Sequence, residues 1–382
     1  MTHIKSMIKN KIENEKGLVF KLSHEIGYKN ATPLYKFLNE PEREMESLTS
    51  LIKIINTLFK GREKELLNEY FKTLKCNGKL IRQALEYSMF HKLEVRSELL
   101  NKIQLSTTSE NKEWGIMYNL YDNMHNDPIE TLNVVNQTKV KSNSMLAFKG
   151  LLQVYSSYLT DIFQCSDELF DIYEERIHDI KNNFLRNSFL MRLYTVKSII
   201  NLDKGRIEEC RKLCHELLDM CNDCYTEAIA YQTLGMSYLF ESYNQGMDFL
   251  TNAKNRYQRN SGRSDGDIRN SINLHNVFWK KPIELIELKT TQDKHDTVMY
   301  FVNVGDISEA TTILESINYD TLSDRDKAFH WYCKGLVTGE IDCYYESIRH
   351  FKRIGDKYYI KFPIIQLKNF GKNDTLLELI VL

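Results

Sequence analysis

Apolar residues recur at spacings of three and four along almost the whole chain, which is the pattern of one face of an α-helix. Segments 48–61, 187–202 and 228–243 show this pattern clearly. The 382 residues include only 5 Pro and 16 Gly, so few helix-breaking residues interrupt it. No segment shows the convincing alternation of apolar and polar residues that is typical of a strand. The sequence therefore predicts an all-α fold.

Short segments rich in glycine, proline, asparagine and aspartate divide the helical pattern. They lie at residues 77–78, 126–128, 203–205, 260–267 and 281–282. Residues of these types end helices and form turns. We expect a connection between helices at each of the five, and the loosest one at 260–267.

The second half of the chain contains degenerate internal repeats. Segments 205–210 and 305–310 resemble each other, and each begins a helix in which a small residue is followed by apolar ones. Equivalent positions recur one repeat later. The expected packing positions of the four helices are Cys210, Cys214 and Leu217; Ala310, Leu314 and Ile317; Met247, Leu250 and Ala253; and Ser347, Phe351 and Ile354.

Two aromatic–glycine pairs support the repeat interpretation. Tyr231 with Gly235, and Trp331 with Gly335, have the spacing found in tetratricopeptide repeats. A small side chain at this place lets two helices approach closely, and bulky residues then lock the next pair. We predict that residues 141–370 form a superhelical solenoid of degenerate tetratricopeptide-like helical pairs.

Residues 18–39 have the pattern of a helix-turn-helix. Residues 18–27 predict a short amphipathic helix that ends at Gly27 and is followed by a turn. Thr32 is a suitable N-cap for a second helix. Pro33 follows it at the first helical position, where proline is favoured. An ordinary helical hairpin is the alternative, since the connection is about one residue longer than the commonest form of the motif.

The second helix of this motif would place its polar face towards DNA. Leu34, Phe37 and Leu38 are expected in the core. The expected DNA-binding residues are Lys29, Asn30, Thr32, Tyr35, Lys36 and Asn39. Residues 1–40 carry seven Lys against four Glu, whereas the whole chain has a formal net charge of −1. Any DNA contact therefore depends on a local patch, because a uniformly basic nucleic-acid binder is excluded.

Several other classes of protein are disfavoured. We find no signal peptide and no run of 18 apolar residues, so we expect a cytoplasmic protein without a membrane span. Cys210, Cys214, Cys221 and Cys224 have a spacing that suggests zinc, but the first two already occupy packing positions. Phosphate loops, nucleophile elbows and zinc-protease motifs are absent. We expect no catalytic residue, no metal and no cofactor.

The whole chain resembles the arbitrium receptor family (AimR), through which temperate phages of bacilli decide between lysis and lysogeny. The resemblance is clearest in residues 17–40, 201–210 and 344–382. It implies a homodimer that binds operator DNA and activates a gene opposing lysogeny. It also implies that a secreted hexapeptide, with an arginine near its carboxyl end, enters the host cell, binds the solenoid and switches this activity off.

The resemblance also assigns peptide-binding positions. They are Leu202, Asp203, Thr233, Leu239, Asp296, Asp356 and Tyr358, of which Asp296 and Asp356 match acidic contact positions. The chain departs from the family pattern in several places. Asp203 and Ile199 stand where other members have Asn, Tyr225 where they have Arg, and Met236 where they have Asn. These departures predict that this chain recognises a peptide of different sequence.

The last residues form an unusually apolar tail. Asn373 or Asp374 can cap a final helix, and segment 375–382 then contains one charge and six large apolar residues. Because a terminal segment is normally polar, we predict that the tail joins two copies of the chain. The expected dimerisation residues are Leu376, Leu377, Leu379 and Ile380. The alternative is a helix that only seals the end of the solenoid.

These expectations divide the chain into four parts. Residues 1–45 are the predicted helix-turn-helix head, 46–140 a linker with the first helical pairs, 141–370 the peptide-binding solenoid and 371–382 the C-terminal dimerisation helix. Two alternatives from other classes remain. The chain could be a peptide receptor that acts on a protein partner rather than on DNA, or a structural repeat scaffold; the helix-turn-helix pattern argues against the former.

Overall fold

The computed structural model describes residues 3–160, 167–221, 223–259, 266–284, 288–373, 375 and 377. Within these residues every regular element is a helix, which confirms the predicted all-α class. The chain divides into two compact units, residues 1–153 with 171–190, and residues 154–170 with 191–382. No described helix is long and apolar enough to cross a membrane. The functional division into head, first pairs, solenoid and tail stays a prediction.

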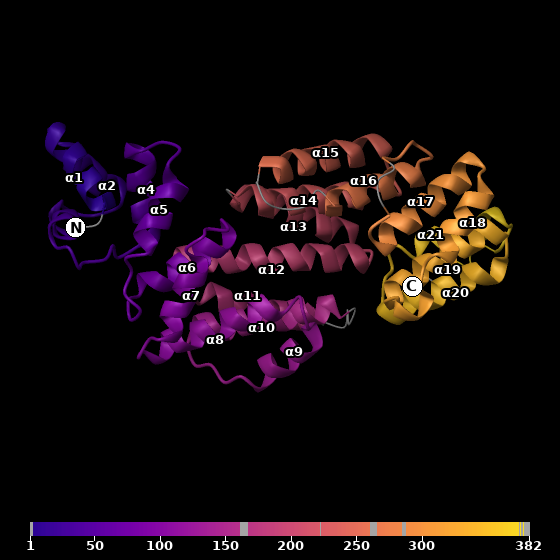
Figure 1. Cartoon of the computed structure of the whole chain (residues 1–382), viewed down its shortest axis with the longest axis horizontal. Coiled ribbons are helices and arrows are strands. Elements are labelled where there is room, and N and C mark those ends of the chain that lie inside the picture. The colour runs from indigo at the N-terminus through magenta and orange to yellow at the C-terminus, as the bar shows by residue number, and fades with distance from the viewer. Residues whose placement is uncertain are drawn as a thin grey trace. The chain divides into compact units, whose positions relative to one another are not determined.

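The first unit begins with nine helices (Figure 1). They are α1 (His3–Asn14), α2 (Leu18–Glu25), α3 (Thr32–Asn39), α4 (Leu48–Leu58), α5 (Glu63–Phe71), α6 (Leu80–Phe90), α7 (Arg96–Gln104), α8 (Ser109–Asn123) and α9 (Pro128–Gln137). Three helices then contribute to both units, namely α10 (Asn143–Leu159), α11 (Asp167–His178) and α12 (Asn183–Asp203). Helix α1 was not predicted, although Ile4, Ile8 and Ile12 repeat every fourth residue and are buried.

An aromatic cluster forms part of the core of the first unit. The ring of Trp114 stacks on Tyr118, and Tyr118 stacks on Phe148 with ring centroids 4.6 Å apart. The fully buried Glu86 accepts hydrogen bonds from the hydroxyl groups of Tyr118 and Ser188. A buried carboxyl group is tolerated here because both hydrogen bonds compensate for the loss of water.

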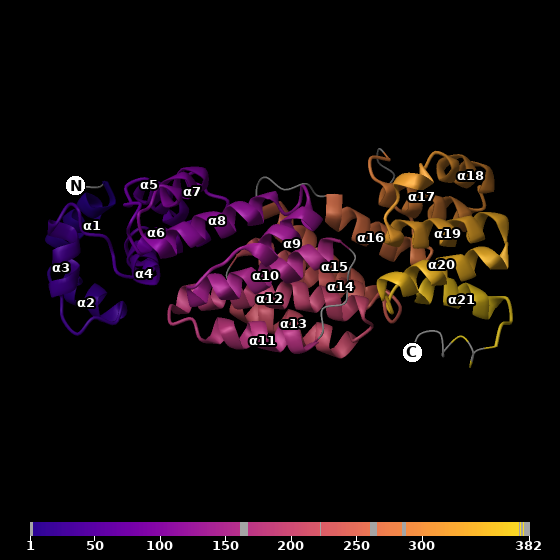
Figure 2. The ribbon, with the colours of Figure 1, turned by 90° about the horizontal axis from the view of Figure 1, so that it is seen from below.

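The second unit continues with nine further α-helices and one 3-10 turn. They are α13 (Ile207–Met220), α14 (Cys224–Ser237), α15 (Tyr243–Arg259), α16 (Gly266–Phe278), α17 (Thr291–Val304), α18 (Ile307–Glu315), the turn Tyr319–Thr321, α19 (Asp324–Thr338), α20 (Ile341–Ile354) and α21 (Lys361–Asn369). Helices next to each other in sequence pack together, as α14 does with α15 and α19 with α20. Figure 2 shows α19, α20 and α21 in successive rows. This solenoid-like arrangement agrees with the predicted helical pairs.

Small residues permit the close approach of these pairs, as the aromatic–glycine spacing indicated. A Cβ atom added to Gly235 would lie 2.6 Å from Cγ of Leu250, and one added to Gly335 would lie 2.7 Å from Cε1 of Tyr344. One predicted packing position was wrong by a residue. Gly246 is buried in α15 whereas Met247 is only half-buried, because the helix presents its glycine rather than its methionine to the neighbouring helix α16.

Candidate functional site

The head has the two helices expected of a helix-turn-helix. Helix α2 ends at Glu25, and Gly27, with a φ of 82°, reverses the chain in the left-handed region that glycine adopts without strain. Thr32 is the first residue of α3 rather than its N-cap, which is Ala31. The side-chain oxygen of Asn30 accepts a hydrogen bond from the Thr32 N–H within the turn, and the helix has no side-chain cap at Ala31.

Helix α3 separates its apolar and polar residues as predicted. Leu34, Phe37 and Leu38 are buried, which confirms the expected core face. The residues predicted to contact DNA are all exposed, namely Lys29, Asn30, Thr32, Tyr35, Lys36 and Asn39. Their contact with DNA stays a prediction.

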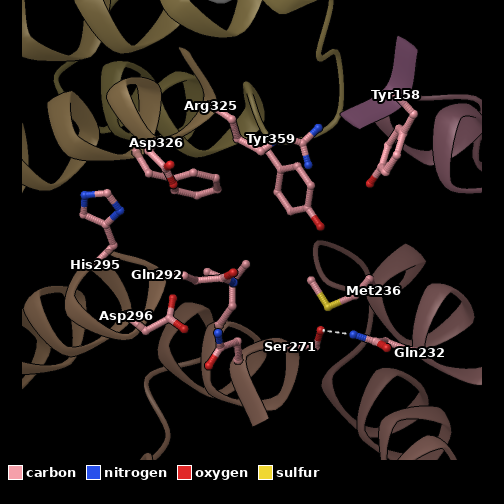
Figure 3. Close-up of a pocket in the computed structure, with 13 residues that line it drawn as sticks. Tyr158, Gln232, Met236, Ser271, Gln292, His295, Asp296, Arg325, Asp326 and Tyr359 are labelled. Carbon is pink, nitrogen blue, oxygen red and sulfur yellow. Dashed lines mark hydrogen bonds between the residues drawn. The ribbon is translucent and has the colours of Figure 1, made fainter. Parts of the chain in front are cut away.

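A pocket of about 310 Å³ lies in the second unit. Its walls come from α10, α14, α16, α17, α19 and the loop before α21. In Figure 3, Arg325 and Tyr359 extend from one wall and Asp296 extends from the opposite one. The lining residues are Tyr158, Gln232, Met236, Asn270, Ser271, Leu274, Gln292, His295, Asp296, Arg325, Asp326, Phe329 and Tyr359.

The start of α17 fixes the position of Asp296. Thr290 and Asp293 form a capping box, and a second oxygen of Asp293 lies 2.9 Å from Nη2 of Arg269. Asp296 follows one turn later on the same face and is 2% exposed. Its Oδ2 atom is buried and has no hydrogen-bond partner. The pocket thus holds a carboxyl group with one oxygen to which no described residue donates a hydrogen bond.

The surroundings of Asp296 disfavour its charged form. Burial raises the pKa of Asp296 well above its usual value, and the nearby Asp293 carboxylate adds to this rise. Burial also lowers the pKa of the neighbouring His295 to about 3, so this imidazole is neutral and offers no positive charge. A cation placed beside Asp296 would stabilise the carboxylate and release its proton.

Asp203 and Asp356 do not line the pocket, and both carboxylates pair with Arg325, which does. The Nη2 atom of Arg325 lies 2.9 Å from Oδ2 of Asp203 and 3.4 Å from Oδ2 of Asp356. Asp203 is 2% exposed and Asp356 is 1% exposed. Burial raises the pKa of both carboxyl groups, and Arg325 opposes the rise. These two acids hold a pocket-lining arginine of the chain itself.

The remaining predicted peptide positions are packed into the interior. Leu202, Thr233, Leu239 and Tyr358 are each buried and do not line the pocket. The hydroxyl of Tyr358 donates a hydrogen bond of 2.6 Å to the main-chain oxygen of Met236. Asp296 is therefore the one position of the predicted seven that lines this pocket. Direct contact of the other six with a peptide stays a prediction.

The structure adds polar pocket residues that the sequence did not reveal. Gln232 donates a hydrogen bond of 2.8 Å to Ser271, and Gln292 lies near Asp296 in Figure 3. Such residues occur on most helix surfaces, so no local pattern distinguishes them. Met236, one of the departures from the family pattern, does line the pocket, whereas Ile199 and Tyr225 do not.

The cysteine array does not converge on one point. Cys210 and Cys214 are fully buried in the packing face of α13, and Cys221 and Cys224 follow at the connection to α14. Among the described residues, no three or more His, Cys, Asp or Glu side chains come together in a way that could hold a metal ion.

Only part of the predicted dimerisation tail can be described. Asn373 accepts a hydrogen bond from the Thr375 N–H at its side chain and one from the Leu377 N–H at its main chain. Leu377 is 2% exposed. Asp374, Leu376, Leu379 and Ile380 lie outside the described residues, so the tail's role stays a prediction.

Sequence comparisons give similar proteins over the full length. A family model described as AimR transcriptional regulator-like matches residues 63–369. The AimR transcriptional regulator of Bacillus phage phi3T is 30% identical over 380 residues, which cover 98% of this chain and 100% of the relative. That of Bacillus phage SPbeta is 28% identical over 392 residues and covers 100% of both chains.

Solved structures agree with these relatives. The structure of SeMet-phAimR covers 99% of this chain and 100% of its own, with a TM-score of 0.71 and 29% identity. The structure of phAimR-Ligand covers 87% of this chain and 100% of its own, with a TM-score of 0.76 and 26% identity.

Proposed function

The chain belongs to the AimR family of transcriptional regulators, and from this premise we propose that it is a peptide-gated, DNA-binding regulator of phage lysis and lysogeny. In this proposal a homodimer in the cytoplasm of the bacterial host binds operator DNA through α2 and α3. A short imported peptide that contains arginine binds the pocket of the second unit and inhibits that activity.

The state of Asp296 is the observation that carries the peptide part of the proposal. A carboxyl group that is 2% exposed and has an unpartnered oxygen is unfavourable unless something else satisfies it. Guanidinium groups bind carboxylates with strong, charge-assisted hydrogen bonds. An arginine side chain of the ligand would therefore use the interaction that Asp296 leaves unused.

The shape and lining of the pocket suit a peptide. Gln232, Asn270 and Gln292 supply amide groups that can donate to and accept from a peptide backbone, and Leu274, Met236 and Phe329 supply apolar surface. The similar protein phAimR has a structure described as bound to a ligand. We extend ligand binding to this chain as part of the proposal.

The surface of α3 supports the DNA part. Thr32, Tyr35, Lys36 and Asn39 lie on one exposed face of a helix whose other face is buried. Polar and basic side chains on a short capped helix are what contact base edges and phosphates in helix-turn-helix proteins.

Footprinting tests both parts at once. The probe is DNA from the region downstream of the protein's gene, with and without a pool of hexapeptides that have one arginine near the carboxyl end and random residues elsewhere. We expect a protected region in the free protein that the pool removes. A protein that binds peptides from the pool but protects no DNA would instead favour a receptor that acts on a protein partner. A protein that binds neither would overturn the proposal.

A further inference from the structure

Asp203 and Asp356 form an acidic niche that is held in place without Arg325. The main-chain oxygen of Asp203, at the end of α12, accepts hydrogen bonds from the N–H groups of Lys357 at 2.7 Å and Tyr358 at 3.2 Å. Oδ1 of Asp356 accepts hydrogen bonds from the N–H groups of Tyr358 at 3.0 Å and Tyr359 at 2.7 Å. These bonds fix the main chain at Asp203 and the carboxylate of Asp356.

The niche requires a cation. Two carboxyl groups buried this close would repel each other if both were charged, and neither has the surrounding water that normally screens such a pair. Arg325, in the first turn of α19, places one guanidinium nitrogen 2.9 Å from Asp203 and 3.4 Å from Asp356. These two carboxylates raise the pKa of Arg325 against the effect of burial, so this guanidinium stays charged.

Asp296 differs from this pair in one respect. It lies on the pocket wall opposite Arg325 and is equally buried, and no ion pair joins it to a cation among the residues that the structure describes. The Oδ2 atoms of Asp296 and Asp356 are both buried without a hydrogen bond, but among the described residues only that of Asp356 has a guanidinium nitrogen near it, at 3.4 Å.

We propose that Arg325 is the specificity-determining residue of the pocket: it fills the guanidinium subsite formed by Asp203 and Asp356 and so directs the cation of the ligand to Asp296. The inference rests on the proposed function, because it deepens how the same pocket selects its peptide. The ligand class that follows is a peptide with a single cationic side chain. A peptide with a second cation would meet Arg325 and be repelled.

Chemical rescue tests the filled niche without any peptide. Arg325→Ala removes the guanidinium and leaves two buried acids unpaired, so we expect the Tm to fall by roughly 5–10 °C. Methylguanidinium chloride at about 20 mM should restore at least half of this loss, because a ligand that binds only the folded state raises its stability. Sodium chloride at equal ionic strength should not.

Two controls make the rescue specific. Wild type, whose niche is filled, should gain less from methylguanidinium than Arg325→Ala does. The double variant Arg325→Ala/Asp356→Asn, whose niche has lost an acid, should also gain less. Equal effects on all three proteins, or no rescue of Arg325→Ala, would overturn the inference. If Arg325→Ala does not fold unaided, the same comparison is made on its refolding yield, measured by circular dichroism with and without methylguanidinium.

A peptide-binding experiment decides where the cation of the ligand binds. With the arginine-containing hexapeptide pool, Asp296→Asn should lower binding at least tenfold, and Asp356→Asn should weaken it less. A larger loss in Asp356→Asn would mean that the ligand displaces Arg325, and the inference would be wrong. If wild type binds no peptide of the pool, the proposed function fails, and rescue by methylguanidinium alone decides whether the niche is filled as inferred.

Discussion

The Nζ atom of Lys5 lies 2.9 Å from the main-chain oxygen of Glu40 and donates a hydrogen bond to it. The same ammonium group donates to the main-chain oxygens of Pro41 at 3.0 Å and Arg43 at 2.7 Å. Lys5 is 1% exposed and lies over the ring of Phe37. A side chain of α1 therefore holds the segment that follows α3, and it fixes the end of the helix to which we assign DNA binding.

Replacing this lysine tests its positioning role. Lys5→Met keeps the apolar stem but removes the ammonium donor from three carbonyl groups, of which that of Glu40 keeps another donor, the Arg43 N–H. The loss should cost about 1–3 kcal/mol of stability. Hydrogen exchange of the α3 amides should accelerate, and operator affinity should fall. Lys9→Met is the matched control, because Lys9 is on the same helix and pairs only with Glu13 at 4.0 Å. Equal effects of the two changes would refute a specific role for Lys5.

Elements set by local sequence were predicted well. The buried face of α3 follows from apolar residues at helical spacing, and the start of α9 follows from Asp127 and Pro128, since Asp127 accepts a hydrogen bond from the Glu130 N–H at 2.9 Å. Gly235 was recognised because a repeat constrains residue size at one place. In each case neighbours in sequence are also neighbours in space.

Long-range pairs could not be predicted in the same way. Arg325 meets Asp203 across 122 positions, and no periodicity in the sequence distinguishes it from the other arginines. The resemblance to a family indicated where acids lie but not that the chain fills one acidic site itself. The pocket amides were missed for the same reason, because Gln232 and Gln292 acquire their role only when α14 and α17 are brought to one cavity.

Lys36→Glu tests the assignment of the DNA-binding helix. Lys36 is exposed on α3, and the change replaces a cation that would attract phosphate with an anion. Operator affinity should fall at least roughly tenfold, the loss expected for a contact worth about 1–3 kcal/mol. The fold should lose about 0.5 kcal/mol or less. Lys212→Glu on α13 serves as control; if Lys36→Glu binds operator as the control does, α3 is not the recognition helix.

Asp296→Asn tests the cationic subsite. The amide has nearly the same shape but cannot take a negative charge, so peptide affinity should fall by about 2–5 kcal/mol in calorimetry. DNA binding without peptide should persist. Asp326→Asn is the control within the same pocket, because its carboxylate already accepts a hydrogen bond of 2.9 Å from the Ser323 hydroxyl. Equal losses in both variants would assign binding to the overall charge of the pocket.

His275 gives the stability a defined dependence on pH. It is fully buried on α16, neither ring nitrogen has a hydrogen-bond partner, and burial lowers its pKa to about 4. Below a pH of about 6.5 the unfolded chain binds a proton here that the folded chain does not, so stability falls as the pH decreases from 6.5 towards 4. At pH values well below both pKa values, this effect lowers the free energy of unfolding by about 3 kcal/mol, at 1.36 kcal/mol per unit of pKa difference.

His275→Leu should remove this component. Urea titrations of both proteins between pH 4 and 7 isolate it, since other titrating groups contribute equally to each and cancel in the difference. The free energy of unfolding of the leucine variant should rise steadily relative to that of the wild type as the pH falls. A difference that is constant across this range would mean that His275 is protonated in the folded protein.

Deletion of the C-terminal tail tests whether the tail joins two copies of the chain or only seals the end of the solenoid. Deleting residues 376–382 removes most of the apolar tail, and fully burying one large apolar side chain is worth roughly 1.5–3 kcal/mol. If the tail joins two copies, the truncated protein should be a monomer by light scattering at micromolar concentration. Its operator affinity should fall strongly, because a head this small needs two half-sites. Peptide binding should change little, since none of the tail residues that the structure describes lines the pocket.

Leu377 supplies the contrasting variant. Its side chain is 2% exposed within a single chain, so the chain itself covers this residue. Leu377→Ala should therefore lower the Tm by an amount that does not depend on protein concentration, as a contact within one chain requires. The full deletion should in addition abolish dimerisation at micromolar concentration. A truncated protein that remains dimeric, with only its Tm reduced, would show that the tail seals the solenoid and that the two copies meet elsewhere.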